Sequence, residues 1–198
     1  MSFGQEASPE MGIVHTIPKQ LWNTDHPAIR KDWLSPFTPN YINNKPEGAI
    51  WTSSAHRQPS GGYTSAWHDW CNENEWPRKD FNVLLIPKKT LTVYEIDNQE
   101  DFLALRATSQ KPFRELTPQC ASEKGVAYLA SFQYHAIDFA YYAQNGLDGI
   151  HVTQNGLDAC SIWAFGFDNT PAMGTLSCWD IESTCWFNMD WVESFQIL

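Results

Sequence analysis

The sequence predicts a single α+β domain, in which a split sheet of mixed or antiparallel strands is accompanied by a few helices. The chain has 198 residues, which is enough for one domain with a sizeable core. Hydrophobic residues make up 42% of it and charged residues only 18%, as in folded rather than disordered chains. Many short strand-like runs are combined with about three helical segments, which is typical of the α+β class. Residues 1–10 are expected to be a flexible leader and residues 11–198 one domain.

Short apolar runs mark the expected strands. The first, at residues 11–18, ends at a proline and has His15 near its end. The run at 48–54 follows a loop at 34–48 that is rich in proline and asparagine, and it closes with three hydroxyl residues. The other expected strands are residues 81–87, 90–97, 148–153, 178–187 and 191–198.

The first expected helix runs to residue 76 from a cap at Thr64 or Ser65. Its apolar face is expected to contain Trp67, Trp70 and Cys71, because these residues are spaced by about one helical turn.

Two further helices are expected later in the chain. Residues 98–107 begin with Asn98 as a cap, and residues 134–146 end at Gly146, a common C-terminal signal. Residues 107–125 have few periodic apolar positions and are expected to be a loop or a mobile lid. The sequence QNGLD occurs at 144–148 and again at 154–158, which is too short to indicate a solenoid and is interpreted as coincidence or paired turns.

Charge and cysteine usage limit the partners and the compartment. The 13 Lys and Arg against 23 Asp and Glu give a formal charge of -10, which repels a phosphate backbone and argues against duplex DNA as a partner. Five cysteines, with no CxxC pair, favour reduced and buried thiols. No signal peptide or membrane span is expected, and we expect a cytoplasmic protein, acting in the cell that makes it or in a target cell.

The stretch CWDIESTCWF, residues 178–187, places two carboxylates in an otherwise apolar run. If this run is a strand, Asp180 and Glu182 share a face with Thr184 and Cys178. Their repulsion and partial burial would raise one pKa. The alternative is that both carboxylates are structural and bond to backbone N–H groups or arginines.

Several other chemistries find little support in the sequence. There is no GxSxG elbow for a serine hydrolase, and PSGGYTS lacks the lysine of a phosphate-binding loop. His68 and Cys71 have no second pair, so no metal site is predicted. Cys-His catalysis stays open, without positive support. Glycosidase chemistry also stays open, since Glu182 could act with a second acid such as Asp97 or Asp148. Ten tryptophans favour a site for a nucleotide, sugar or base.

Dispersed motifs resemble the ADP-ribosyltransferase superfamily. They are His15 and Thr16 in VHTIP, the strand motif IWTSS with Trp51, Thr52, Ser53 and Ser54, the aromatic residues Tyr63 and Trp67, and Asp180 and Glu182 in WDIES. The resemblance implies an ADP-ribosyltransferase-like fold over residues 11–198 and an enzyme that cleaves the nicotinamide glycosidic bond of NAD. ADP-ribose would pass to a protein, nucleic-acid or small-molecule acceptor.

The resemblance also implies roles for these residues. Glu182 would be catalytic and bond the 2′-hydroxyl of the nicotinamide ribose, and Tyr63 or Trp67 would stack on nicotinamide. His15 would bond a ribose, with Thr16 beside it, and the residues Thr52 to Ser54 would shape the strand beneath the nicotinamide. Asp180 stands where the family usually has Glu or Gln, which leaves the acceptor open.

A toxin, a defence factor and a host modifier are equally compatible with the sequence. As acceptor we expect a protein or a single-stranded nucleic acid rather than duplex DNA. Two other readings are a glycoside-cleaving hydrolase that uses Glu182 and a non-catalytic, aromatic-rich binding module.

Overall fold

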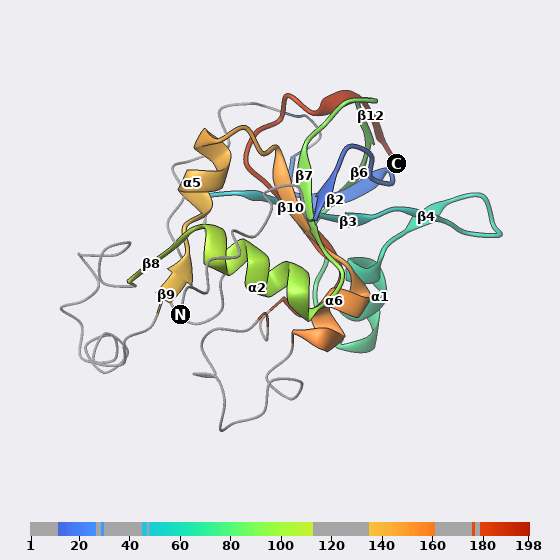
Figure 1. Cartoon of the computed structure of the whole chain (residues 1–198). Helices are drawn as coiled ribbons and strands as arrows, with labels where there is room; N and C mark the ends of the chain where they lie inside the picture. The colour runs from blue at the N-terminus through green and yellow to red at the C-terminus, as the bar shows by residue number, and fades with distance from the viewer. Residues whose placement is uncertain are drawn as a thin grey trace, which may run out of the picture.

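Strand β11 (Ser183–Trp186) lies inside an eight-stranded sheet, although it comes late in the chain. The strand order is β1-β7-β10-β11-β3-β2-β6-β12. Strand β10 pairs in parallel with β7 and antiparallel with β11, so the sheet is mixed, and it curls as it passes from β3 to β2 (Figure 1). This computed structural model describes residues 12–26, 29, 45–46, 48–112, 135–160, 176 and 179–198. The predicted α+β class, with a mixed sheet and few helices, is confirmed.

The bounds of the elements are as follows. The other strands of the sheet are β1 (Ile13–Val14), β2 (Gln20–Thr24), β3 (Ile50–Ser54), β6 (Phe81–Pro87), β7 (Val93–Ile96), β10 (Gly149–Val152) and β12 (Val192–Ile197). Two small antiparallel pairs are β4 (His56–Arg57) with β5 (Tyr63–Thr64), and β8 (Gln110–Pro112) with β9 (His135–Ile137). The helices are α1 (Ala66–Glu73), α2 (Gln99–Thr108), α5 (Phe139–Gln144) and α6 (Gln154–Ala159).

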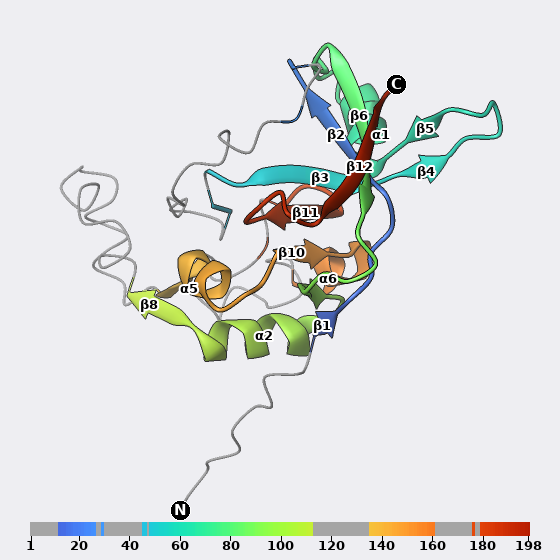
Figure 2. The ribbon, with the colours of Figure 1, turned by 90° about the horizontal axis from the view of Figure 1, so that it is seen from above.

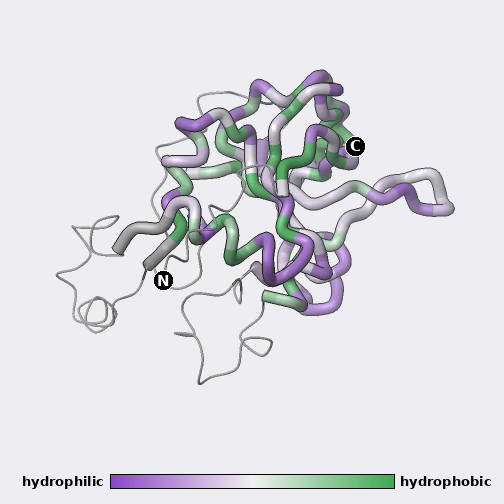
Figure 3. Tube along the Cα trace, in the orientation of Figure 1, coloured by the Kyte–Doolittle hydropathy of each residue, from purple (hydrophilic) through white to green (hydrophobic). Residues whose placement is uncertain are grey.

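A hydrophobic cluster packs on each face of the sheet. On one face, residues of β7 and β10 pack against α2, α5 and α6, with Phe102, Leu105 and Phe139 as anchors. On the other face, Val93, Trp186 and residues of β6 form a second cluster. Figure 2 shows α2 and α5 along the β7–β10 half of the sheet and α1 beside the β6–β12 half. In Figure 3 hydrophobic colour is concentrated in the central strands, whereas the projecting β4–β5 hairpin is mostly pale or hydrophilic.

Local signals account for the helix ends. The Asn98 side chain accepts a hydrogen bond from the Asp101 N–H, so the predicted cap of α2 is confirmed. Gly146 follows α5 with a φ of +89°, the left-handed conformation that glycine adopts without strain. Ser65 is the N-cap of α1, but its side chain makes no capping hydrogen bond.

Several sequence-based boundaries were wrong. Strand β11 begins at Ser183 rather than at residue 178, because Ile181 and Glu182 form a bend before it. Residues 135–137 of the third predicted helix form strand β9, and α5 begins only at Phe139. The expected loop at 107–125 contains the end of α2 and strand β8. In α1 the buried pair is His68 and Cys71.

The QNGLD repeat has two different structures, since its first copy covers the end of α5 and a turn and its second begins α6. Residues 1–10, residues 113–125 and the cysteines 120 and 178 lie outside the described residues. The described cysteines, Cys71, Cys160 and Cys185, are buried and free, as predicted. Within the described segments, each helix is too short or too polar to cross a membrane.

Candidate functional site

The carboxylate of Glu182 is bound to the end of strand β3. The Ser54 hydroxyl donates to Glu182 Oε1 at 2.8 Å, and the Ser54 backbone N–H donates to Oε2 at 3.0 Å and to Oε1 at 3.3 Å. The register explains the contact, because β11 pairs antiparallel with β3 through Thr184 and Thr52, which sets Glu182 opposite Ser54. The structure therefore brings together the IWTSS and WDIES motifs, which are 128 residues apart.

A buried polar network continues from this contact into the sheet. Its centre is Gln20 of β2, which is fully buried and pairs with Ser54. The Gln20 side chain contacts Ser54 Oγ, Thr52 Oγ1 and Thr184 Oγ1 at 3.4, 2.7 and 3.1 Å. Trp186 Nε1 donates to Thr52 Oγ1 at 2.7 Å. Residues from β2, β3 and β11 therefore hold one another in fixed rotamers beneath Glu182.

His151 of β10 lies next to this carboxylate. Its Nδ1 is 2.9 Å from Thr184 Oγ1 and 3.6 Å from Glu182 Oε1, and the side chains of His151 and Glu182 are 6% and 13% exposed. Burial lowers the pKa of His151 to about 4, against the opposing effects of a backbone hydrogen bond at Ser183 and the charge of Asp97.

Burial likewise shifts the titration of Glu182. It raises the pKa of Glu182, while the hydrogen bonds from Ser54 and the charge of His56 act in the opposite direction. The site therefore combines a neutral imidazole with a desolvated carboxylate that Ser54 orients. Such a carboxylate can stabilise a cationic transition state, because few waters screen it.

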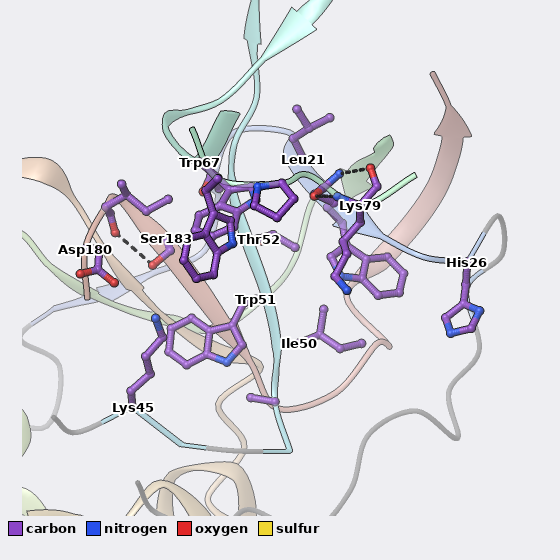
Figure 4. Close-up of a pocket in the computed structure, with 17 residues that line it drawn as sticks. Leu21, His26, Lys45, Ile50, Trp51, Thr52, Trp67, Lys79, Asp180 and Ser183 are labelled. Carbon is purple, nitrogen blue, oxygen red and sulfur yellow. Dashed lines mark hydrogen bonds between the residues drawn. The ribbon is translucent and has the colours of Figure 1, made fainter. Parts of the chain in front are cut away.

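A pocket of about 600 Å3 is lined by residues of β2, β3 and α1 and by the segment that leads into β11 (Figure 4). Trp51 and Ser53 of β3, Trp67 of α1, and Asp180 line it. The Lys45 ammonium lies 5.0 Å from the centroid of the Trp51 ring, a cation–π distance. The volume is within the range of about 300–1,000 Å3 that is usual for small-molecule sites.

The pocket and the Glu182 carboxylate lie on opposite sides of the paired ends of β3 and β11. Side chains alternate along a strand, so Ser53 and Ser183, which line the pocket, point away from the side of Ser54. The prediction that Asp180 and Glu182 belong to a strand and share one of its faces is wrong, because both residues precede β11. Asp180 is exposed and lines the pocket, whereas Glu182 bonds Ser54.

Three of the predicted ligand residues lie elsewhere. His15 Nδ1 contacts the Leu91 carbonyl oxygen at 2.9 Å, beyond the Val93 end of β7. Glu182 lies near the Ile96 end of β7, because the next residue, Ser183, pairs with Val152, and Val152 in turn pairs with Ile96. At about 3.3 Å per residue, the length of β7 alone separates the two residues by about 10 Å. Thr16 follows His15 on an exposed segment, and Tyr63 lies in the β4–β5 hairpin below the Lys19 ammonium.

Two central residues were missed by the sequence reasoning. Gln20 was not assigned to any strand, and His151 was treated only as part of an expected strand. The available signal for His151 was one titratable residue in GIHV, a strand whose four residues are all buried. No comparable signal marks Gln20, which follows a proline and a lysine.

In the described segments, no three His, Cys, Asp or Glu side chains are grouped so as to hold a metal ion. Comparisons of the chain with family models, curated proteins and solved structures find no match.

Proposed function

We propose that the chain is an NAD-dependent ADP-ribosyltransferase in which Glu182 is the catalytic residue. The observation that carries the proposal is the anchoring of the Glu182 carboxylate by Ser54 at 2.8 and 3.0 Å. These residues belong to two of the motifs on which the family resemblance depends. Two independent short motifs that meet in one buried site are stronger support than either motif alone.

The chemistry of the reaction matches what this site can provide. The bond between the nicotinamide nitrogen and the ribose carbon breaks, and its electron pair leaves with nicotinamide. The acceptor atom then bonds to the same carbon and releases its proton to solvent. An oxocarbenium-like positive charge develops on the ribose, and the fixed Glu182 carboxylate stabilises it. Because burial keeps His151 neutral, its imidazole does not cancel that negative charge.

We assign the adenine end of NAD to the pocket, because the nicotinamide ribose must lie at the Glu182 carboxylate, which faces the other side of the paired ends of β3 and β11. Trp51 and Trp67 offer apolar ring faces, and the pocket reaches Ile181 and Ser183 on either side of Glu182. Asp180 lines the same pocket and is assigned to positioning the acceptor. His15 and Thr16 receive no role in NAD binding, because they lie at the other end of β7.

The decisive experiment measures nicotinamide release from NAD by the purified protein, first alone and then with cell lysate. Glu182→Gln is expected to lower release by about 100-fold or more, the scale of losing one preorganised electrostatic contact. Glu193→Gln, on the exposed strand β12, is the matched control and is expected to behave as wild type. Equal release by a folded Glu182→Gln protein would refute the proposal.

The same assay separates release from transfer. Labelled NAD with lysate identifies the acceptor, as protein, nucleic acid or small molecule. Asp180→Asn is expected to reduce transfer to that acceptor more than it reduces nicotinamide release. A Trp67→Leu variant is expected to raise KM for NAD with a smaller change in kcat, since it removes a stacking face and no reacting group.

A further inference from the structure

The Gln20 side chain has one defined orientation. Its Nε2 lies 3.2 Å from the carbonyl oxygen of Pro18, an atom that only accepts hydrogen bonds. The amide nitrogen must therefore face Pro18, and Oε1 must face Thr52 and Thr184 at 2.7 and 3.1 Å. Both N–H groups and both lone pairs of this buried amide are used, because Nε2 also lies 3.4 Å from Ser54 Oγ.

This orientation sets the direction of the threonine hydroxyls. The Trp186 Nε1–H only donates, so Thr52 Oγ1 accepts from it at 2.7 Å and sends its own proton to Gln20. Thr184 also donates to Gln20, at 3.1 Å, and so has no proton left for His151. The contact of 2.9 Å between Thr184 Oγ1 and His151 Nδ1 is then a hydrogen bond donated by Nδ1–H. Neutral His151 is left with an unprotonated Nε2.

The same reasoning applies to Ser54. Its oxygen accepts from Gln20 Nε2, so its single proton is directed to Glu182 Oε1 at 2.8 Å. A hydrogen bond donated to a carboxylate favours the ionised form. The direction of every hydroxyl in the network therefore follows from the orientation of one amide.

We propose that Gln20 is a positioning residue that orders the protons of this network, fixing the Ser54 hydroxyl on Glu182 and the Nδ1–H tautomer on His151. Gln20 acts on Glu182 through Ser54 and on His151 through Thr184. Its effect on catalysis rests on the proposed function, whereas its effect on the tautomer does not. The two can therefore fail separately.

The first test needs no NAD, and it uses a substitution only to assign the signal. Nitrogen-15 NMR of the imidazole groups in the wild-type protein at pH 7 is expected to show His151 protonated at Nδ1 and unprotonated at Nε2, with assignment by loss of the signal in His151→Gln. A His151 protonated at Nε2 would overturn the proposal, whether or not the protein turns over NAD.

The second test removes parts of the network. Gln20→Met keeps the approximate shape of the side chain without its hydrogen bonds, and Thr184→Val removes the hydroxyl that accepts from His151. Both variants are expected to change the tautomer signal and to lower kcat for nicotinamide release by about 10- to 100-fold with little change in KM. Thr108→Val, on α2 away from the site, is the control. A folded Gln20→Met protein with the wild-type tautomer and kcat would overturn the proposal.

If the wild-type protein releases no nicotinamide but His151 has the expected tautomer, the proposed function fails and the proton ordering is retained. If release depends on Glu182 while the tautomer is the opposite one, the proton ordering fails and the function is retained.

Discussion

Replacing His151 by glutamine tests whether the centre of the site is as desolvated as its geometry indicates. The pKa of His151 falls from 6.5 to about 4 on folding, mainly through burial. In the unfolded chain His151 binds a proton below pH 6.5, whereas in the folded protein it stays neutral until about pH 4. Its contribution to the free energy of unfolding is therefore present above pH 6.5 and is lost as the pH falls toward 4.

The size of this loss follows from the shift. At 1.36 kcal/mol per pKa unit, His151 accounts for about 3 kcal/mol of pH-dependent stability. Glu182 acts in the opposite direction, because its pKa is raised. The stability that Glu182 contributes is present below its ordinary pKa of 4.5 and is lost as the pH rises through its folded pKa. Burial also lowers the pKa of His68 and raises the pKa of Glu95, so the wild-type profile alone mixes several opposing effects, and the difference from the variant isolates His151.

The assay is urea unfolding followed by tryptophan fluorescence at intervals between pH 7.5 and pH 4.5. Relative to His151→Gln, wild-type protein is expected to lose about 2–3 kcal/mol over this range. Thr108→Val, which changes an exposed residue without a titratable group, is the control and should keep a constant difference from wild type. If wild type and His151→Gln lose stability in parallel, the inference of a buried, neutral His151 is refuted.

Three further predictions concern the site and the sheet around it. Ser54→Ala removes the 2.8 Å hydrogen bond to Glu182, and we expect it to lower the free energy of unfolding by about 1.5–3 kcal/mol and the rate of nicotinamide release by about 10- to 100-fold. Ser194→Ala, on the exposed strand β12, is the control and should leave both quantities unchanged. Gly156→Ala would place a Cβ atom 2.0 Å from the backbone oxygen of Ile96, so we expect the free energy of unfolding in urea to fall by more than about 2 kcal/mol. A variant as stable as wild type would contradict the packing of α6 on β7. Burial raises the pKa of the Cys185 thiol, so we expect this cysteine to resist alkylation at pH 8 in the folded protein and to react after denaturation. Mass spectrometry of the alkylated protein measures the difference.

The elements that the sequence predicts well are those with a strong local signal. Strand β6 has the predicted bounds, 81–87, because its apolar run ends at a proline. Helix α2 begins where Asn98 caps it. Strand β9 was assigned to a helix because its residues continue the apolar spacing of α5, and only pairing with β8 makes them extended. Tertiary pairing overrides local pattern at such places.

The site was predictable only in part, for a related reason. Ser54 and Glu182 each belong to a recognisable motif, but their contact depends on β11 pairing with β3 rather than with a sequence neighbour. Gln20 could not be identified, because a glutamine becomes significant only when β2 is placed beside β3 and its amide is enclosed. The bend before Ser183, which separates Asp180 from Glu182, likewise depends on where β11 can begin to pair.

The position of β11 between β10 and β3 also has a consequence for how the protein is made. Its partners are synthesised before it, and the bond between Gln20 and Thr184 spans 164 residues. Until the ribosome has released residues 183–186, β10 and β3 each have an unpaired edge, which is a surface prone to aggregation. Contacts of such long sequence separation also slow folding. The nascent chain therefore cannot hold the Glu182 carboxylate on Ser54 in a finished sheet until synthesis has passed β11, and any premature stop before that point leaves a protein with two open sheet edges.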